Sequence, residues 1–77
     1  MTITQNVDIT IAEVIRKNAD NPGLGEKDDF FDSGISSLTV VNMQMEIENI
    51  LNKKVETKEL MKNPSIDGWV SVYSSAL

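Results

Sequence analysis

The chain has 77 residues, a formal net charge of −5 and neither cysteine nor histidine, so it can form one domain with a modest core but no disulfide, no Cys- or His-based metal site and no Ser-His triad. The negative charge disfavours nucleic acid and anionic membranes as partners. Because no apolar run approaches the roughly 18 residues of a membrane helix and no secretory signal is evident, we expect a non-catalytic, cytoplasmic domain spanning residues 1–77.

The first predicted element is a helix over about residues 6–18, followed by a long loop. Apolar side chains recur in the helix with a period near 3.6, at Val7, Ile11, Val14 and Ile15. Pro22 and the glycines beside it stop this pattern, and no helical period returns before residue 37. A loop this long in so small a domain is unusual unless it packs or has a function. We expect its apolar residues to pin it to the core: Leu24, Phe30, Phe31 and Ile35.

The second helix is predicted over residues 37–51, with Ser36 as its N-cap. It carries two apolar stripes. The stripe with the spacing of a core face comprises Val40, Met43, Ile47, Ile50 and Leu51. The adjacent stripe comprises Leu38, Val41 and Met45. Because a chain of 77 residues has little mass to bury both, we expect the adjacent stripe to be at least partly exposed for docking a partner.

Two further helices are predicted over residues 57–62 and 65–75. Thr57 is the expected N-cap of the first, which Asn63-Pro64 ends. Ser65 is the expected N-cap of the second. Its apolar spacing predicts a core face formed by Ile66, Trp69, Val70 and Tyr73. These elements predict an all-α fold.

Acidic residues surround the start and the length of the second helix. Residues 26–51 contain a single basic residue, Lys27, against six acidic ones: Glu26, Asp28, Asp29, Asp32, Glu46 and Glu48. In the rest of the chain, acidic and basic residues balance. The cluster is either an ordinary solvated face or a surface that steers basic partners toward this region.

Residues 30–38 are the most informative segment of the chain. They bring two phenylalanines, a glycine turn and a serine pair to the start of the second helix, as Phe30-Phe31-Asp32-Ser33-Gly34-Ile35-Ser36-Ser37-Leu38. A hydroxyl placed there lies near the positive end of the helix dipole, which suits an attached phosphate. The frame Phe-Phe-Asp-x-Gly-x-x-Ser-Leu resembles the attachment segment of acyl and peptidyl carrier proteins. The Phe-Phe-Asp start and Asn63-Pro64-Ser65-Ile66 resemble carriers of nonribosomal peptide and polyketide assembly more than fatty-acid carriers.

The resemblance covers about residues 7–72 and implies a four-helix bundle of carrier type, with a long loop between helices one and two and a short third helix. It implies that Ser37 bears a covalent 4′-phosphopantetheine arm whose thiol holds an acyl or aminoacyl group as a thioester. The partners would be a phosphopantetheinyl transferase, a loading enzyme and downstream biosynthetic enzymes. The carrier itself would be discrete and monomeric. The residues we expect to contact them are Leu38, Val41, Met45, Glu46 and Glu48.

The chain departs from the carrier pattern at two positions. In the family the residue before the modified serine is commonly Asp or His, which helps the transferase to recognise the carrier; here it is Ser36. Asn42 likewise stands where an acid is often found. Ser33 is the weaker attachment candidate, because it would put Gly34 at the opening of a helix. The alternative function is an unmodified acidic adaptor that binds a basic and apolar groove through helix two, whereas the missing His and Cys disfavour a small hydrolase.

Overall fold

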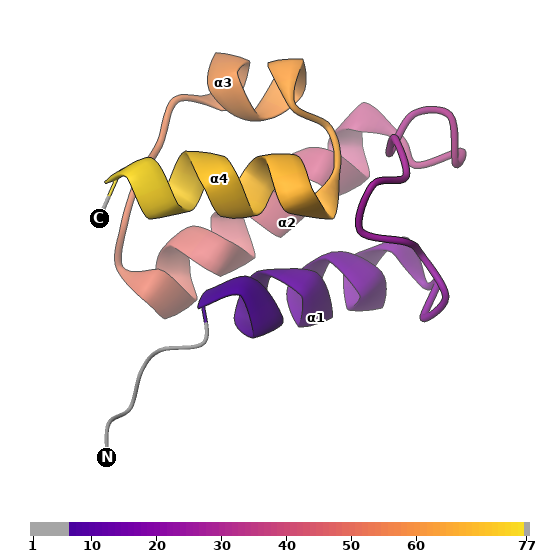
Figure 1. Cartoon of the computed structure of the whole chain (residues 1–77), viewed down its shortest axis with the longest axis horizontal. Helices are drawn as coiled ribbons and strands as arrows, with labels where there is room; N and C mark the ends of the chain where they lie inside the picture. The colour runs from indigo at the N-terminus through magenta and orange to yellow at the C-terminus, as the bar shows by residue number, and fades with distance from the viewer. Residues whose placement is uncertain (1–6, 77) are drawn as a thin grey trace.

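The computed structural model describes residues 7–76, which form four helices: α1 (Val7–Ala19), α2 (Ser37–Leu51), α3 (Thr57–Lys62) and α4 (Ile66–Ala76). α1 packs against both α2 and α4, and the short α3 packs against α4. The loop between α1 and α2 closes one end of the bundle, opposite the end where α1 begins and α4 stops (Figure 1). This all-α bundle with a long first loop and a short third helix confirms the predicted fold class. Residue 6, expected to open the first helix, lies outside the described residues.

α1 ends in a hydrogen-bonded cap that sends the chain into the long loop. Asp20 adopts a left-handed conformation with φ of 55°. Its N–H donates to the Lys17 carbonyl, and the Asn21 N–H donates to the Arg16 carbonyl, both at 3.1 Å. This is the Schellman arrangement, with aspartate in the position that glycine usually occupies. The Arg16 side chain then reaches forward, and its Nε donates to the Leu24 carbonyl at 2.9 Å.

The long loop packs onto the bundle through three of its four expected anchors. Leu24, Phe30 and Ile35 are buried in the core. Phe31, which the sequence analysis placed in the core, is 41% exposed. The reason is the tight turn that follows Phe30. Within it, the Ile35 N–H donates to the Phe30 carbonyl at 2.9 Å and the Gly34 N–H to the Phe31 carbonyl at 3.1 Å, and only one aromatic ring of the pair is directed inward.

The inner face of α2 carries most of the stripe predicted for it, with two changes. Val40, Met43 and Ile47 are buried. Ile50, expected on the same face, is 53% exposed, because it borders a surface hollow between α1 and α2 where the polar side chains of Thr10 and Glu13 face it. Gln44 is buried instead, although it is polar. Its burial is compensated by hydrogen bonds to three partners: Glu48, the Val55 carbonyl and Thr57.

α3 begins differently from the prediction. Glu56 is the N-cap and its side chain makes no capping hydrogen bond. Thr57, expected as the cap, is the first helical residue, and its hydroxyl donates to Gln44 Oε1 at 3.0 Å. The threonine therefore ties α3 to α2 rather than capping its own helix.

α4 provides the largest side chains of the core, as its spacing predicted. Ser65 Oγ accepts a hydrogen bond from the Gly68 N–H at 3.0 Å, which confirms its capping role. Trp69 and Tyr73 are fully buried. The Trp69 Nε1 donates to the Leu60 carbonyl at 3.0 Å. The indole ring of Trp69 packs edge to face against the ring of Phe30, with 5.4 Å between the ring centroids. A Cβ at Gly68 would lie 2.5 Å from the backbone oxygen of Asn63, so this close turn requires glycine.

The buried Tyr73 hydroxyl has no hydrogen-bond partner among the described residues. Burial, helped by the nearby Glu48 carboxylate, raises the pKa of Tyr73 above its usual value of about 10. The Tyr73 hydroxyl therefore holds its proton more tightly in the folded state than in the unfolded state. Its contribution to the unfolding free energy is therefore fully present below about pH 10 and decreases as the pH rises.

We expect Tyr73→Phe to leave stability at pH 7 unchanged or slightly raised, because it removes an unpaired buried hydroxyl. Above about pH 10 the variant should lose less unfolding free energy than the parent chain, because it has no phenol to ionise. Urea unfolding of both proteins across an alkaline pH series measures this. Parallel losses in the two proteins would show that ionisation of Tyr73 does not govern alkaline unfolding.

Candidate functional site

Ser36 and Ser37 stand side by side at the start of α2 but have different surroundings. Ser36 is the N-cap, with φ of −81° and ψ of 159°. Its Oγ accepts a hydrogen bond from the Thr39 N–H at 3.2 Å and lies 3.1 Å from Thr39 Oγ1. Ser37 is the first helical residue and is exposed. Within residues 7–76 no hydrogen bond engages its hydroxyl, so capping uses Ser36 and leaves the Ser37 hydroxyl uncommitted.

Ser33, the weaker candidate, lies in the turn ahead of the helix. Its N–H is shared between the carbonyls of Asp29 at 3.0 Å and Phe30 at 3.1 Å. Gly34 follows with φ of +87°, a conformation that glycine adopts readily and other residues adopt at a cost. This turn keeps Ser33 off α2 altogether. Of the three serines in the segment, only Ser37 combines an uncommitted hydroxyl with a place on the helix.

The start of α2 suits a phosphate group. The first turn contains no acidic residue, so the positive end of the helix dipole is not compensated by a side-chain carboxylate. A hollow of about 190 Å³ lies beside it, between the end of α1 and the turn, and Ser33, Ser36, Thr39 and Asn21 contribute polar lining. An anion esterified to Ser37 would thus meet helix N–H groups and hydroxyls at its base. The residues present fit a phosphodiester at this position.

The outer face of α2 is apolar and exposed. Leu38 is 72% exposed, Met45 63% and Val41 37%, so the expected exposure of the adjacent stripe is confirmed. An open hollow of about 650 Å³ extends from Met45 toward the end of α2. Its lining includes both acids of the helix and two lysines of the following connection: Glu46, Glu48, Lys53 and Lys54. The face therefore offers apolar contacts bordered by charge.

Residues 8–72, most of the chain, match the family model described as the phosphopantetheine attachment site. The chain belongs to this family of carrier domains. Members of the family bear 4′-phosphopantetheine covalently on a serine and are generally non-catalytic. The comparison with curated proteins found no match. None of the helices within residues 7–76 combines the length and apolar composition needed to cross a membrane.

The two acids on α2 of this carrier have different roles in the fold. Glu46 forms an ion pair with Lys17 of α1 and accepts a hydrogen bond from Asn18 Nδ2 at 3.1 Å. These contacts, with Lys17 contributing most, lower the pKa of Glu46 below its usual value. Glu48 accepts a hydrogen bond from Gln44 Nε2 at 3.0 Å and makes no ion pair with any described residue. Its negative charge is the less neutralised of the two.

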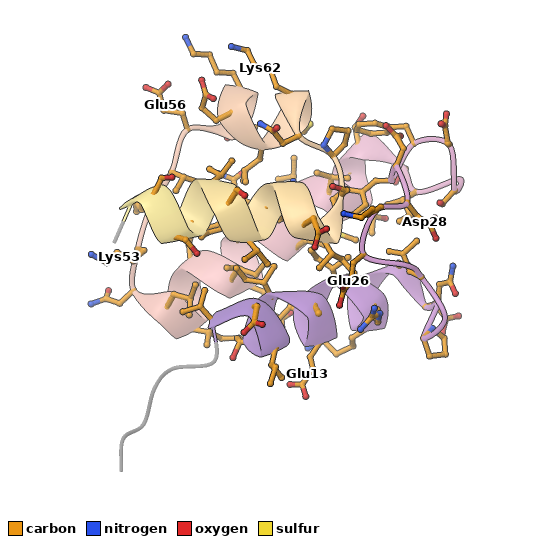
Figure 2. All side chains as sticks on the ribbon, in the orientation of Figure 1. Glu13, Glu26, Asp28, Lys53, Glu56 and Lys62 are labelled. Atoms are coloured by element: carbon orange, nitrogen blue, oxygen red, sulfur yellow. The ribbon has the colours of Figure 1, made fainter. Side chains whose placement is uncertain are left out.

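The acidic residues of the long loop lie at one end of the carrier. Asp28 lies on the long loop, at the end of the bundle near the start of α2, whereas Lys53 lies at the opposite end (Figure 2). Some loop acids also have a structural use. Asp28 accepts a hydrogen bond from the Gly25 N–H at 2.8 Å, and Asp29 accepts from the N–H groups of Phe31 and Asp32. The acidic cluster is therefore both part of the loop architecture and a source of negative potential.

Sequence reasoning missed two contributors to the carrier's site region. Gln44 holds the start of α3 against α2, and no sequence signal distinguishes a buried glutamine from an exposed one. Phe31 is exposed within the attachment segment. The only sequence signal for this was the adjacent Phe30, because two consecutive side chains in a turn point in different directions.

Proposed function

We propose that this chain is an acyl or aminoacyl carrier that bears its 4′-phosphopantetheine arm on Ser37. One observation supports this above all: Ser37 is exposed on the first turn of α2, and its hydroxyl makes no hydrogen bond with any described residue. The arm would supply a terminal thiol that holds biosynthetic intermediates as thioesters. The Phe-Phe-Asp frame supports nonribosomal peptide or polyketide biosynthesis as the setting, with a monomeric carrier acting in the cytoplasm.

The chain's own part in this function is to present Ser37 rigidly. Ser36 and Thr39 fix the first turn of α2, and the buried Phe30 and Ile35 fix the segment before it. A long arm on a fixed base confines its terminal group to a small volume around the carrier. Each docked enzyme then meets that group at a raised effective concentration.

We propose the outer face of α2 as the surface that docks partner enzymes. Leu38, Val41 and Met45 would give apolar contacts, and the charges of Glu46 and Glu48 would attract basic surfaces. Exposed apolar side chains next to Glu48, whose charge has no ion-pair partner among the described residues, favour a partner with an apolar patch edged by lysine or arginine. A phosphopantetheinyl transferase, a loading enzyme and downstream enzymes are the partners that this function requires.

The experiment that tests the function is the intact mass of the purified protein after incubation with coenzyme A and a broad-specificity phosphopantetheinyl transferase. We expect one phosphopantetheinyl group per chain. A chain that stays unmodified, yet still binds a basic and apolar groove through α2, would instead support the acidic adaptor.

Reversing one acidic charge at a time tests electrostatic docking. Glu48→Lys should slow arm attachment about three- to tenfold at low salt, and the deficit should shrink as salt is added because exposed charges are screened beyond about 8 Å at physiological ionic strength. Glu46→Lys should slow it as well, but with a loss of stability, since the new lysine would face Lys17.

Glu56→Lys is the matched control for Glu48→Lys. It makes the same change in net charge on α3, where the Glu56 side chain makes no capping hydrogen bond. Rates measured across a salt series compare the two. Equal and salt-insensitive rates for Glu48→Lys and Glu56→Lys would mean that the acidic face is only a solvated surface.

A further inference from the structure

Phe31 is a fixed aromatic residue on the surface of the long loop. Its backbone is held on both sides: the N–H donates to Asp29 Oδ1 at 2.8 Å, and the carbonyl accepts from the Gly34 N–H at 3.1 Å. Asp29 Oδ1 also accepts from the Asp32 N–H at 3.0 Å, which locks the same turn. The ring of Phe31 is nevertheless 41% exposed, whereas that of Phe30 is buried. An aromatic side chain presented on a rigid backbone loses little freedom when a partner covers it.

The turn that carries Phe31 lies close to Ser37 in space. Ser37 is three positions after Gly34, so at most about 10 Å of chain lies between them. The Phe31 carbonyl is in turn 3.1 Å from the Gly34 nitrogen. One side of a standard protein interface covers about 800 Å², equivalent to a disc of about 16 Å radius. A partner centred on Ser37 therefore covers the Phe31 turn.

The exposed side chains around Phe31 define the chemistry of that partner. Asp32 follows it directly, is exposed, and forms no ion pair with any described residue. Asp28 is exposed on the same loop. Leu38, the most exposed large apolar side chain described in α2, follows Ser37. The surface before Ser37 thus pairs an aromatic ring with negative charge, which complements an apolar cleft bordered by lysine or arginine.

We propose that Phe31, with Asp32 beside it, is a docking element for the enzyme that attaches the arm, and that its ring enters an apolar, basic-edged cleft of that enzyme. The inference rests on the proposed attachment at Ser37. The transferase is the favoured occupant because it must bring its reaction centre to the Ser37 oxygen itself. Enzymes that act on the thiol also dock along α2, but they react at the far end of a long arm and do not need to contact this turn.

Steady-state kinetics of arm attachment with coenzyme A test the proposal on four variants of the full chain. Phe31→Ala should lower kcat/KM about tenfold, mainly through a higher KM, a larger loss than any fall in the folded fraction caused by truncating this partly buried side chain. Phe31→Leu should retain most of the rate, because it keeps an apolar side chain. Asp32→Asn should reduce the rate at low salt and make it less sensitive to added salt. Ile50→Ala is the control: it truncates a side chain that is also exposed, about 20 Å along α2 from Ser37, and should change the rate less than twofold.

Modification of Phe31→Ala at the parent rate, or an equal fall in Ile50→Ala, would overturn the docking role of Phe31. A fall in rate accompanied by an equal fall in the folded fraction would overturn it too. These outcomes are separate from failure of the proposed function, because that failure would appear as an absence of modification in the parent chain itself.

Discussion

Ser37→Ala should abolish attachment of 4′-phosphopantetheine, whereas Ser36→Ala and Ser33→Ala should still acquire the group. The reason is positional: the Ser37 hydroxyl is uncommitted on the first helical turn, Ser36 caps that turn, and Ser33 lies in the preceding loop. Intact mass and peptide mapping of each variant after treatment with coenzyme A and transferase measure the result.

Stability measurements are the control for these three variants. Ser37→Ala should melt at the parent temperature, because the lost hydroxyl makes no hydrogen bond with a described residue. Ser36→Ala should lose about 1 kcal/mol of unfolding free energy through the lost N-cap, and its modification should be slower but complete. A phosphopantetheinyl peptide that persists in Ser37→Ala would overturn the assignment.

Met43→Ala should cost about 2–5 kcal/mol of unfolding free energy, while Met45→Ala should cost less than about 0.5 kcal/mol. The two substitutions are chemically identical and lie two residues apart on α2, but Met43 is fully buried and Met45 faces solvent. For a domain with a total stability of about 5–15 kcal/mol, the first loss is a large fraction of the whole. Urea unfolding of both variants measures the difference.

The same pair separates folding from docking. Met45→Ala and Val41→Ala should weaken the binding of partner enzymes while the unfolding free energy stays nearly unchanged. Ile47→Ala, by contrast, should destabilise the fold as Met43→Ala does. Large and similar losses of unfolding free energy at all four positions would mean that both stripes of α2 are core. Docking would then have to use another face.

Apolar periodicity was sufficient to predict three of the helices because it is a local property of the sequence, and the helix over residues 57–62 was predicted from the signals that flank it, Thr57 and Asn63-Pro64. Within the described residues, α2 and α3 have the expected bounds, α1 ends one residue later than expected and α4 begins one residue later. Periodicity was not sufficient at the borders of the core. Ile50 has the spacing of a core residue, yet polar side chains of α1 face it. Gln44 is buried because Thr57 and Val55, brought close by the fold, satisfy its amide group.

The attachment segment was predictable for a different reason, since its frame of residues is contiguous in the sequence. What surrounds Ser37 was less predictable. Phe30 and Phe31 are chemically identical, and only the turn closed between residues 30 and 35 decides which ring is buried. The ion pair of Glu46 joins α2 to Lys17, a residue 29 positions away. No local pattern indicates such a partner.

Two backbone hydrogen bonds join the long loop to the residues around the start of α4. The Phe30 N–H donates to the Pro64 carbonyl at 2.7 Å, and the Asp67 N–H donates to the Glu26 carbonyl at 2.9 Å. Both bonds link segments that are far apart in the chain and outside regular helix hydrogen bonding. We therefore expect the long loop and the start of α4 to open together, because releasing either one breaks these two bonds.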